Sequence, residues 1–152
     1  MDIVRKSMPK HLFTEDIKFL QKVVVFHPEK KDLFLALKRP STVKSRPNCW
    51  DLPGGNVNFG ERHDVALRRE VVEETELEIE HVKPIHVLTN FDQTNKIYYL
   101  YIGYMAHAIN DDVHIGEEHT QYKWVTQSEF LELQSADFLQ DHVMKVFEIV
   151  SE

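Results

Sequence analysis

Apolar and polar positions alternate in short blocks along the chain, and these blocks predict strands and helices in mixed order. Residues 19–26 contain three consecutive valines and are typical of a buried strand. Residues 27–32 are polar and include a proline, so they predict a turn, and residues 33–37 predict the returning strand. Residues 38–49 hold two prolines together with serine and basic residues, which indicates a loop.

The middle of the chain predicts one helix followed by a hairpin. Residues 61–75 predict the helix, and residues 77–79 predict a short strand after it. Strands at 84–91 and 96–109 flank a polar turn at 90–95, so we expect them to pair antiparallel.

The last third of the chain predicts a final strand and two helices. An acidic loop at 110–119 leads into a strand at 122–125. Thr126 and Glu129 have the spacing of a capping box, which predicts a short helix through Leu133.

A final helix is predicted to begin with Asp137 and Gln140 as its cap. Its apolar stripe, which we expect to pack in the core, comprises Val143, Val146, Phe147 and Val150. Interleaved helices and strands with antiparallel hairpins predict an α/β fold in which helices pack on a mixed sheet.

Length and composition favour one globular domain over residues 1–152, in which residues 1–16 form an arm or an added strand. No apolar run approaches the roughly 20 residues of a membrane span, and the first residues lack the apolar region of a signal peptide. Cys49 is the single cysteine, so a reducing cytoplasm is expected. The net charge of −7 makes a general nucleic-acid surface unlikely.

Three carboxylates share one face of the predicted helix. A helix advances about 100° per residue, so Glu70, Glu73 and Glu74 fall within an arc of roughly 100°. Like charges that close repel each other, and a hard divalent cation such as Mg²⁺ or Mn²⁺ would reverse the penalty. The alternative is a solvated acidic helix face.

The spacing around these carboxylates resembles the Nudix box, the signature of the Nudix hydrolases. Trp50 to Gly55 and the stretch from Glu117 to Val125 also resemble the flanks of the box in that family. The matching box positions are Gly55, Glu61, Arg69, Glu70, Val71, Glu73, Glu74 and Leu77. Glu76 departs from the pattern, because the family has glycine there.

This resemblance implies an α/β/α sandwich that carries a loop–helix–loop catalytic motif. It also implies a metal-dependent hydrolase that cleaves a phosphoanhydride bond in a nucleoside diphosphate linked to another group. The substrate could be a nucleotide sugar, ADP-ribose, a dinucleoside polyphosphate or a nucleoside triphosphate. The alternative is a non-catalytic module of the same fold that binds a nucleotide or a protein. A homodimer is expected by analogy with the family.

The resemblance also assigns roles to residues. Glu70, Glu73 and Glu74 become metal ligands together with the Gly54 carbonyl. Glu61 would assist through water or hydrogen bonds, although it could simply favour the helix dipole. Arg69 would orient neighbouring carboxylates through its planar fork, or form a plain surface ion pair. For the general base, Glu70 is the first candidate and Glu118 the second, with Glu117 behind it.

Substrate contacts are predicted from charge and aromatic character. Arg39 and Arg46 lie in a basic segment just before the box and would help to accept phosphates. Trp50 is the aromatic candidate chosen for substrate contact, and the others are Phe59, Tyr98, Tyr99 and Tyr101. Tyr98 and Tyr101 must point to opposite faces of a strand, so the aromatic candidates cannot all line one pocket. At Glu76 we expect retained activity with a shifted helix end.

Overall fold

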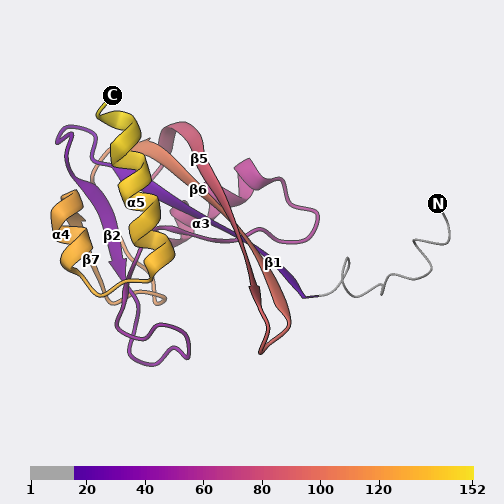
Figure 1. Cartoon of the computed structure of the whole chain (residues 1–152). Helices are drawn as coiled ribbons and strands as arrows, with labels where there is room; N and C mark the ends of the chain where they lie inside the picture. Colours follow the sequence, from indigo (N-terminus) through magenta and orange to yellow (C-terminus); the bar gives the residue numbers. More distant parts are fainter. Residues whose placement is uncertain (1–15) are drawn as a thin grey trace, which may run out of the picture.

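The computed structural model describes residues 16–152, so almost all of the arm predicted at residues 1–16 lies outside the described residues. Figure 1 shows the order of elements along the chain. They are β1 (Ile17–Phe26), β2 (Phe34–Lys38), β3 (Trp50–Asp51), β4 (Gly54–Asn56), α3 (His63–Thr75), β5 (Ile79–Asp92), β6 (Ile97–Ala108), β7 (Gln121–Val125), α4 (Gln127–Glu132) and α5 (Asp137–Val150).

The strands form one mixed sheet. Its main path runs β3-β2-β1-β6-β5, while β4 pairs with β1 and β7 pairs with β2. The long pairing of β1 with β6 is parallel, and the β5–β6 hairpin is antiparallel as predicted. Since β1 contacts β2, β4 and β6, it is the strand around which the sheet is built.

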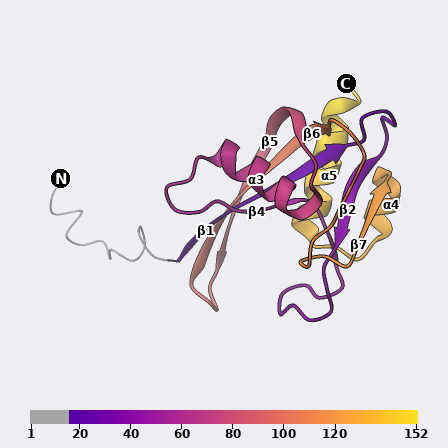
Figure 2. The same cartoon turned by 180° about the vertical axis from the view of Figure 1, so that it is seen from behind.

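Helices cover both faces of the sheet because successive strand residues point to opposite sides. Val23 and Val25 pack in one core cluster with Leu67 and Val71 of α3. The other core cluster joins the opposite face of the strands to the two C-terminal helices and includes Val24, Phe26, Phe130, Leu139, Val143 and Val146. Figures 1 and 2 show α5 and α3 on opposite sides of the sheet, which confirms the α/β/α sandwich.

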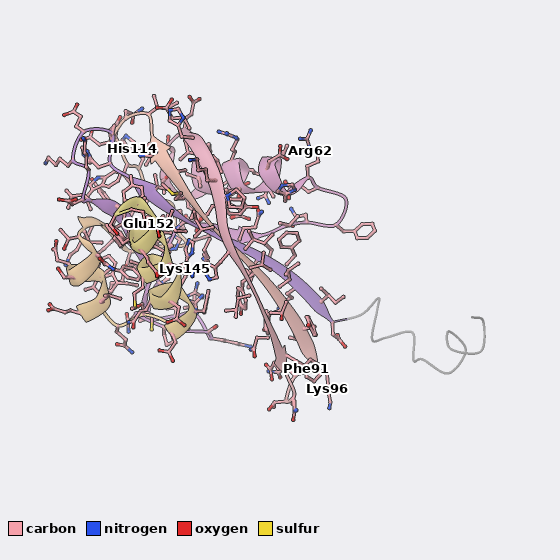
Figure 3. All side chains as sticks on the ribbon, turned by 45° about the horizontal axis from the view of Figure 1, so that its top comes forward. Arg62, Phe91, Lys96, His114, Lys145 and Glu152 are labelled. Atoms are coloured by element: carbon pink, nitrogen blue, oxygen red, sulfur yellow. The ribbon has the colours of Figure 1, made fainter. Side chains whose placement is uncertain are left out.

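The β5–β6 hairpin is longer than predicted. Of the short strand expected at 77–79, only Ile79 is in a strand, and it is the first residue of β5. β5 continues through two irregularities in its register, between Glu80 and Lys83 and between Pro84 and His86. Figure 3 shows Phe91 and Lys96 at the far end of this hairpin, away from the helices. Because β5 bends at these irregularities rather than ending, two predicted strands become one.

The helix ends show one prediction confirmed and two wrong. Thr126 and Glu129 form the predicted capping box of α4. The cap predicted for α5 is wrong, because Ala136 occupies the N-cap position and no side chain caps the helix. The shifted end predicted for α3 is also wrong: Glu76 adopts the left-handed conformation with φ 60°, and its N–H donates to the Val72 carbonyl. The helix therefore ends as it would with glycine.

In the part of the chain that the structure describes, no helix is both long and apolar enough to cross a lipid bilayer.

Candidate active site

An open cavity of about 680 Å³ lies between the second half of α3, the early halves of β1 and β6, and the loop after β2. Its walls differ in chemistry. The acidic lining residues are Asp51, Glu70, Glu74, Glu117 and Glu118, the basic ones are Lys18, Lys22, Arg39 and Arg46, and the aromatic ones are Tyr99, Tyr101 and Phe138. The cavity therefore presents carboxylates and cations together, as a site for a metal-bound anion requires.

The glycine turn lets α3 approach the sheet closely. Gly54 has φ 132°, and a Cβ atom on it would collide with the Gln21 carbonyl. A Cβ atom on Gly55 would lie 2.7 Å from a carboxylate oxygen of Glu70. Both glycines are thus required by geometry, the first for its backbone angles and the second for the space that Glu70 fills.

Glu74 is the most deeply placed carboxylate of the site. Its side chain is 4% exposed, and its Oε1 accepts a 2.8 Å hydrogen bond from the Gly54 N–H. Burial raises the pKa of Glu74 to about 8, against the opposing effects of Lys22 and this hydrogen bond. A buried carboxylate with so little compensation is a place where a bound cation would be stabilising.

Arg69 holds three carboxylates through its guanidinium group. Its Nε and Nη2 donate to the two oxygens of Glu61 at 2.7 and 3.0 Å. Its Nη1 donates to Glu70 and to Glu73, both at 3.1 Å. The hydrogen bonds from Arg69 lower the pKa of Glu61, and the three carboxylates raise the pKa of Arg69. Only a planar fork can serve this many acceptors at once.

The predicted ligands are divided between two environments. Glu70 and Glu74 line the cavity, whereas Glu73 is more than half exposed, bonds to Arg69 and does not line it. Among residues 16–152 no three histidine, cysteine or acidic side chains converge as a ready-made metal site. At Gly54 the N–H is occupied by Glu74, and the metal role predicted for its carbonyl stays a prediction.

All three candidates for the general base, Glu70, Glu118 and Glu117, line the cavity. Burial raises the pKa of Glu70, Arg69 opposes this, and the nearby Glu73 and Glu118 raise it further. The late loop lies next to α3, because Glu118 and Glu70 both line the cavity and His119 Nε2 lies 3.6 Å from Glu74 Oε2. A carboxylate with a raised pKa is suited to accept a proton near neutral pH.

A buried carboxylate organises the basic wall. Asp51 is fully buried, and its oxygens lie 3.1 Å from Lys22 Nζ, 3.3 Å from Arg39 Nη1 and 3.5 Å from Arg46 Nη2. Burial alone would raise the pKa of Asp51, but Lys22 and Arg46 outweigh it and hold the pKa below its usual range. One anion against three cations leaves this wall positively charged.

The structure separates the predicted substrate contacts. Arg39 and Arg46 line the cavity, whereas Trp50 does not. The Trp50 side chain is 6% exposed and packs in the core cluster beneath α4 and α5, with Lys38 and Lys123 over its ring. Of the other aromatic candidates, Tyr99 and Tyr101 line the cavity, while Phe59 and Tyr98 are exposed elsewhere.

Sequence reasoning missed Lys22, His119 and Phe138 as lining residues. His119 Nε2 lies 3.6 Å from Glu74 Oε2, and burial lowers the pKa of His119 to about 4. The His119 ring is therefore uncharged at pH 7, so this contact is not an ion pair. A signal for Lys22 was available, because a lysine within an otherwise apolar strand needs a buried partner.

Comparison with known proteins decides the family. The family model described as NUDIX domain matches residues 21–147. The chain belongs to the Nudix hydrolase family. The resemblance carried by the box is thereby confirmed, and so is the prediction that the chain is an enzyme of this family rather than a non-catalytic module.

Relatives and solved structures agree with this Nudix assignment. The chain is 38% identical over 103 residues to "Nucleoside triphosphatase NudI" of Enterobacter sp. (strain 638), which covers 62% of this chain and 73% of that protein. The NUDIX domain of Shewanella oneidensis NrtR, solved with ADP ribose, has a TM-score of 0.77 at 15% identity and covers 98% of this chain and 97% of that one. A MutT protein from Methanosarcina mazei Go1 has a TM-score of 0.73 at 24% identity, covering 90% and 96%.

Proposed function

We propose that this Nudix hydrolase binds Mg²⁺ or Mn²⁺ and hydrolyses a phosphoanhydride bond of a small nucleotide, with nucleoside triphosphates as the first class to test. The observation that carries the proposal is one cavity lined by the buried Glu74, the partly buried Glu70 and three cations anchored on Asp51. The name of the Enterobacter relative, a nucleoside triphosphatase, supports this choice within the family.

The residues at the acidic end fit a divalent cation. Glu74 is buried with a pKa raised to about 8, and Glu70 occupies the space that the missing Cβ of Gly55 leaves. Glu70, Glu74, the Gly54 carbonyl and the more exposed Glu73 would hold the ion through hard oxygen donors. When bound, the ion supplies neutralisation of phosphate charge and acidification of a coordinated water.

Arg69 and Glu61 position these carboxylates rather than touch the substrate. Neither residue lines the cavity. The bidentate pair of hydrogen bonds from Arg69 to Glu61 fixes the direction of the guanidinium, which in turn donates to Glu70. Glu70, and after it Glu118, is our candidate to accept the proton of the attacking water. Arg69→Lys should therefore lower kcat by about 10-fold, since loss of a group that supports a ligand costs about 10- to 100-fold.

Arg39 and Arg46 are our candidates for phosphate binding. Both line the cavity while bonded to Asp51, so they are held in place before the substrate arrives. Nη1 of Arg46 is buried and has no hydrogen-bond partner within the described residues, so the guanidinium keeps a donor that its contact with Asp51 does not use. Trp50 does not share this position, and we no longer assign it a direct contact.

The test is phosphate or pyrophosphate release from nucleoside triphosphates, nucleotide sugars, ADP-ribose and dinucleoside polyphosphates, with Mg²⁺, Mn²⁺ or chelator. We expect turnover of triphosphates that chelator abolishes and that Glu70→Gln and Glu74→Gln each remove. Glu78→Gln, at an exposed carboxylate just beyond α3, is the matched control and should keep full activity. Turnover that survives chelator or both substitutions would overturn the proposal.

Two further predictions concern the whole molecule. A cytoplasmic location is consistent with Cys49, which is free and buried. A homodimer would use β5, an edge strand of the sheet that exposes Val87, Leu88 and Phe91. Light scattering across a concentration series gives the molecular mass, and a mass of one chain at all concentrations would contradict the dimer.

A further inference from the structure

Three aromatic rings form a continuous wall on the side of the cavity away from α3. Tyr99 and Tyr101 are stacked with centroids 5.7 Å apart and planes 12° apart. Tyr101 in turn lies 4.6 Å from the ring of Phe138, at the start of α5. The guanidinium of Arg46 lies over Phe138, 5.5 Å from the ring centroid. The row of aromatic rings therefore ends at Arg46, which also belongs to the basic side of the cavity.

Strand register places this aromatic wall opposite the glycine turn. Across β1, Leu20 pairs with Tyr101 of β6 on one side and with Asn56 of β4 on the other. Neighbouring strands lie about 4.8 Å apart, so Tyr101 is about 10 Å from the glycine turn, with only β1 between them. Leu20 also lines the cavity, so the carboxylates and the aromatic rings face a single continuous space.

Packing in the core does not account for the two tyrosines. Tyr99 and Tyr101 are part-exposed, line the cavity and belong to neither core cluster, whereas Phe138 packs partly against the second. Tyr98 lies on the other side of β6, where it contacts Phe91 and is exposed to solvent, so it serves as a comparison for a tyrosine of this strand outside the cavity. Rings held in a stack at a polar cavity offer a flat partner for another flat ring.

We propose that Tyr99, Tyr101 and Phe138 form the nucleobase seat of the enzyme, and that this seat accepts purines and pyrimidines alike. The proposal rests on the proposed function, because it assigns the base of the same nucleotide whose phosphates face Arg39 and Arg46. Stacking on aromatic side chains tolerates any base, since every base has a π-face.

Discrimination between bases would need donors and acceptors held at the edge of the ring. Among the described lining residues Asn56 is the one amide side chain, and it lies across β1 from the tyrosines. The carboxylate of Asp51 is already engaged by three cations. Glu117 and Glu118 lie between Gly116 and His119, and these two residues approach Glu73 and Glu74 of α3. In the part of the chain that the structure describes, the lining carboxylates are thus held by the cations or gathered at α3 rather than at the ring wall.

Equilibrium binding tests the seat without relying on catalysis. Titration calorimetry would compare adenosine, guanosine, cytidine and uridine monophosphates with ribose 5-phosphate, which has no base. We expect Tyr101→Leu and Phe138→Leu each to raise the Kd of all four nucleotides by about 10-fold, within the range of stacking on one aromatic side chain. The Kd of ribose 5-phosphate should stay the same. Tyr98→Leu is the matched control and should change none of these constants.

Hydrolysis provides the second readout. For the wild-type enzyme we expect kcat/KM of the four nucleoside triphosphates to lie within about 10-fold of one another, and we expect Tyr101→Leu to raise every KM. If Tyr101→Leu and Tyr98→Leu change the nucleotide Kd values equally, the base binds elsewhere. The same conclusion follows if Tyr101→Leu raises the Kd of ribose 5-phosphate as much as that of the nucleotides. Preference for one base by more than 100-fold would overturn the claim of tolerance. Base-dependent binding without turnover would instead refute the proposed function and leave the seat standing.

Discussion

The helices α3 and α5 cover opposite faces of the same sheet and are held there by different forces. The buried residues of α5 are the apolar Leu139, Val143 and Val146, together with His142. Those of α3 include a carboxylate, Glu74, and a hydroxyl, Thr75, beside Ala66, Leu67 and Val71. Beyond Phe138 at its start, which lines the cavity, the sequence of α5 thus serves the core, whereas that of α3 serves the core with one side and the cavity with the other.

Each helix also buries one titratable group, and burial keeps both groups neutral. The pKa of Glu74 rises to about 8, and that of His142 falls to about 4. The His142 ring lies against Gly103, where a Cβ atom would collide with it, and its Nε2 lies 2.9 Å from the Tyr104 carbonyl. The His142 ring is thus held by a backbone carbonyl and by close packing, whereas Glu74 lines a cavity in which a bound cation would stabilise its charged form.

The largest effect that separates the two helices should come from Glu74→Gln. Loss of a direct ligand should cost more than loss of a group that supports one, so kcat/KM should fall on the order of 1,000-fold, about 4 kcal/mol. Stability without metal should hold or rise, because an ill-compensated buried carboxylate is removed. Steady-state kinetics and urea unfolding in chelator measure both. If Glu74→Gln lowered the free energy of unfolding as much as it raised the activation free energy, Glu74 would have a structural role rather than that of a metal ligand.

On the α5 side of the sheet, Phe130→Ala should have the opposite result. Phe130 is fully buried in the core cluster that contains α5, and deletion of a buried phenylalanine costs about 4 kcal/mol. Because Phe130 does not line the cavity, kcat of the folded fraction should stay near the wild-type value. Urea unfolding gives the first quantity, and kinetics at low temperature gives the second. A large fall in kcat would show that this core cluster and the cavity are coupled.

The pH dependence of stability should sharpen the contrast. The native pKa of His142 is about 4, below its ordinary value of 6.5, so the unfolded chain binds more protons between these pH values. The contribution of His142 is therefore complete above pH 6.5 and is lost as the pH falls to 4, by at most about 3 kcal/mol. Glu74 acts in the opposite direction, since its raised pKa favours the folded state as the pH falls from 8 toward 4.5.

Because these two contributions oppose each other, the measurement is a difference between variants. We expect the free energy of unfolding of wild type minus that of His142→Gln to fall as the pH is lowered from 6.5 to 4. The same difference for His63→Gln, at an exposed histidine of α3, is the control for the replacement of a histidine that is not buried. A difference for His142 that does not vary with pH would mean that its ring protonates equally in both states.

The smallest effect is expected at the end of α3. Glu76 holds φ at 60°, which costs a residue other than glycine about 1 kcal/mol, so Glu76→Gly should raise the free energy of unfolding by about that amount. Activity should be retained, because the left-handed conformation is already present. Complete loss of activity in Glu76→Gly would show that this side chain has a role of its own.

Sequence patterns were informative wherever one local rule decided the structure. The strands of the hairpin, the box helix and the capping box of α4 follow from periodicity and side-chain chemistry within a few residues. The position of Trp50 did not, because a tryptophan beside the glycine turn can face either side of the sheet, and the backbone pairing of Trp50 with residues 134 and 135 decides it. The aromatic wall likewise depends on the distant pairing of β1 with β6, which no local pattern encodes.

That parallel ladder has a consequence for how the molecule is made. Each residue of β1 pairs with a residue of β6 about 80 positions later in the chain. A ribosome therefore releases β1 long before its longest partner exists, and pairings at such separation form slowly. The glycine turn, α3 and the loop after β2 are synthesised between β1 and β6, but the cavity that they line is complete only when β6 has paired with β1. Nascent chains shorter than β6 should thus hold all the box residues and still lack a place to bind a nucleotide.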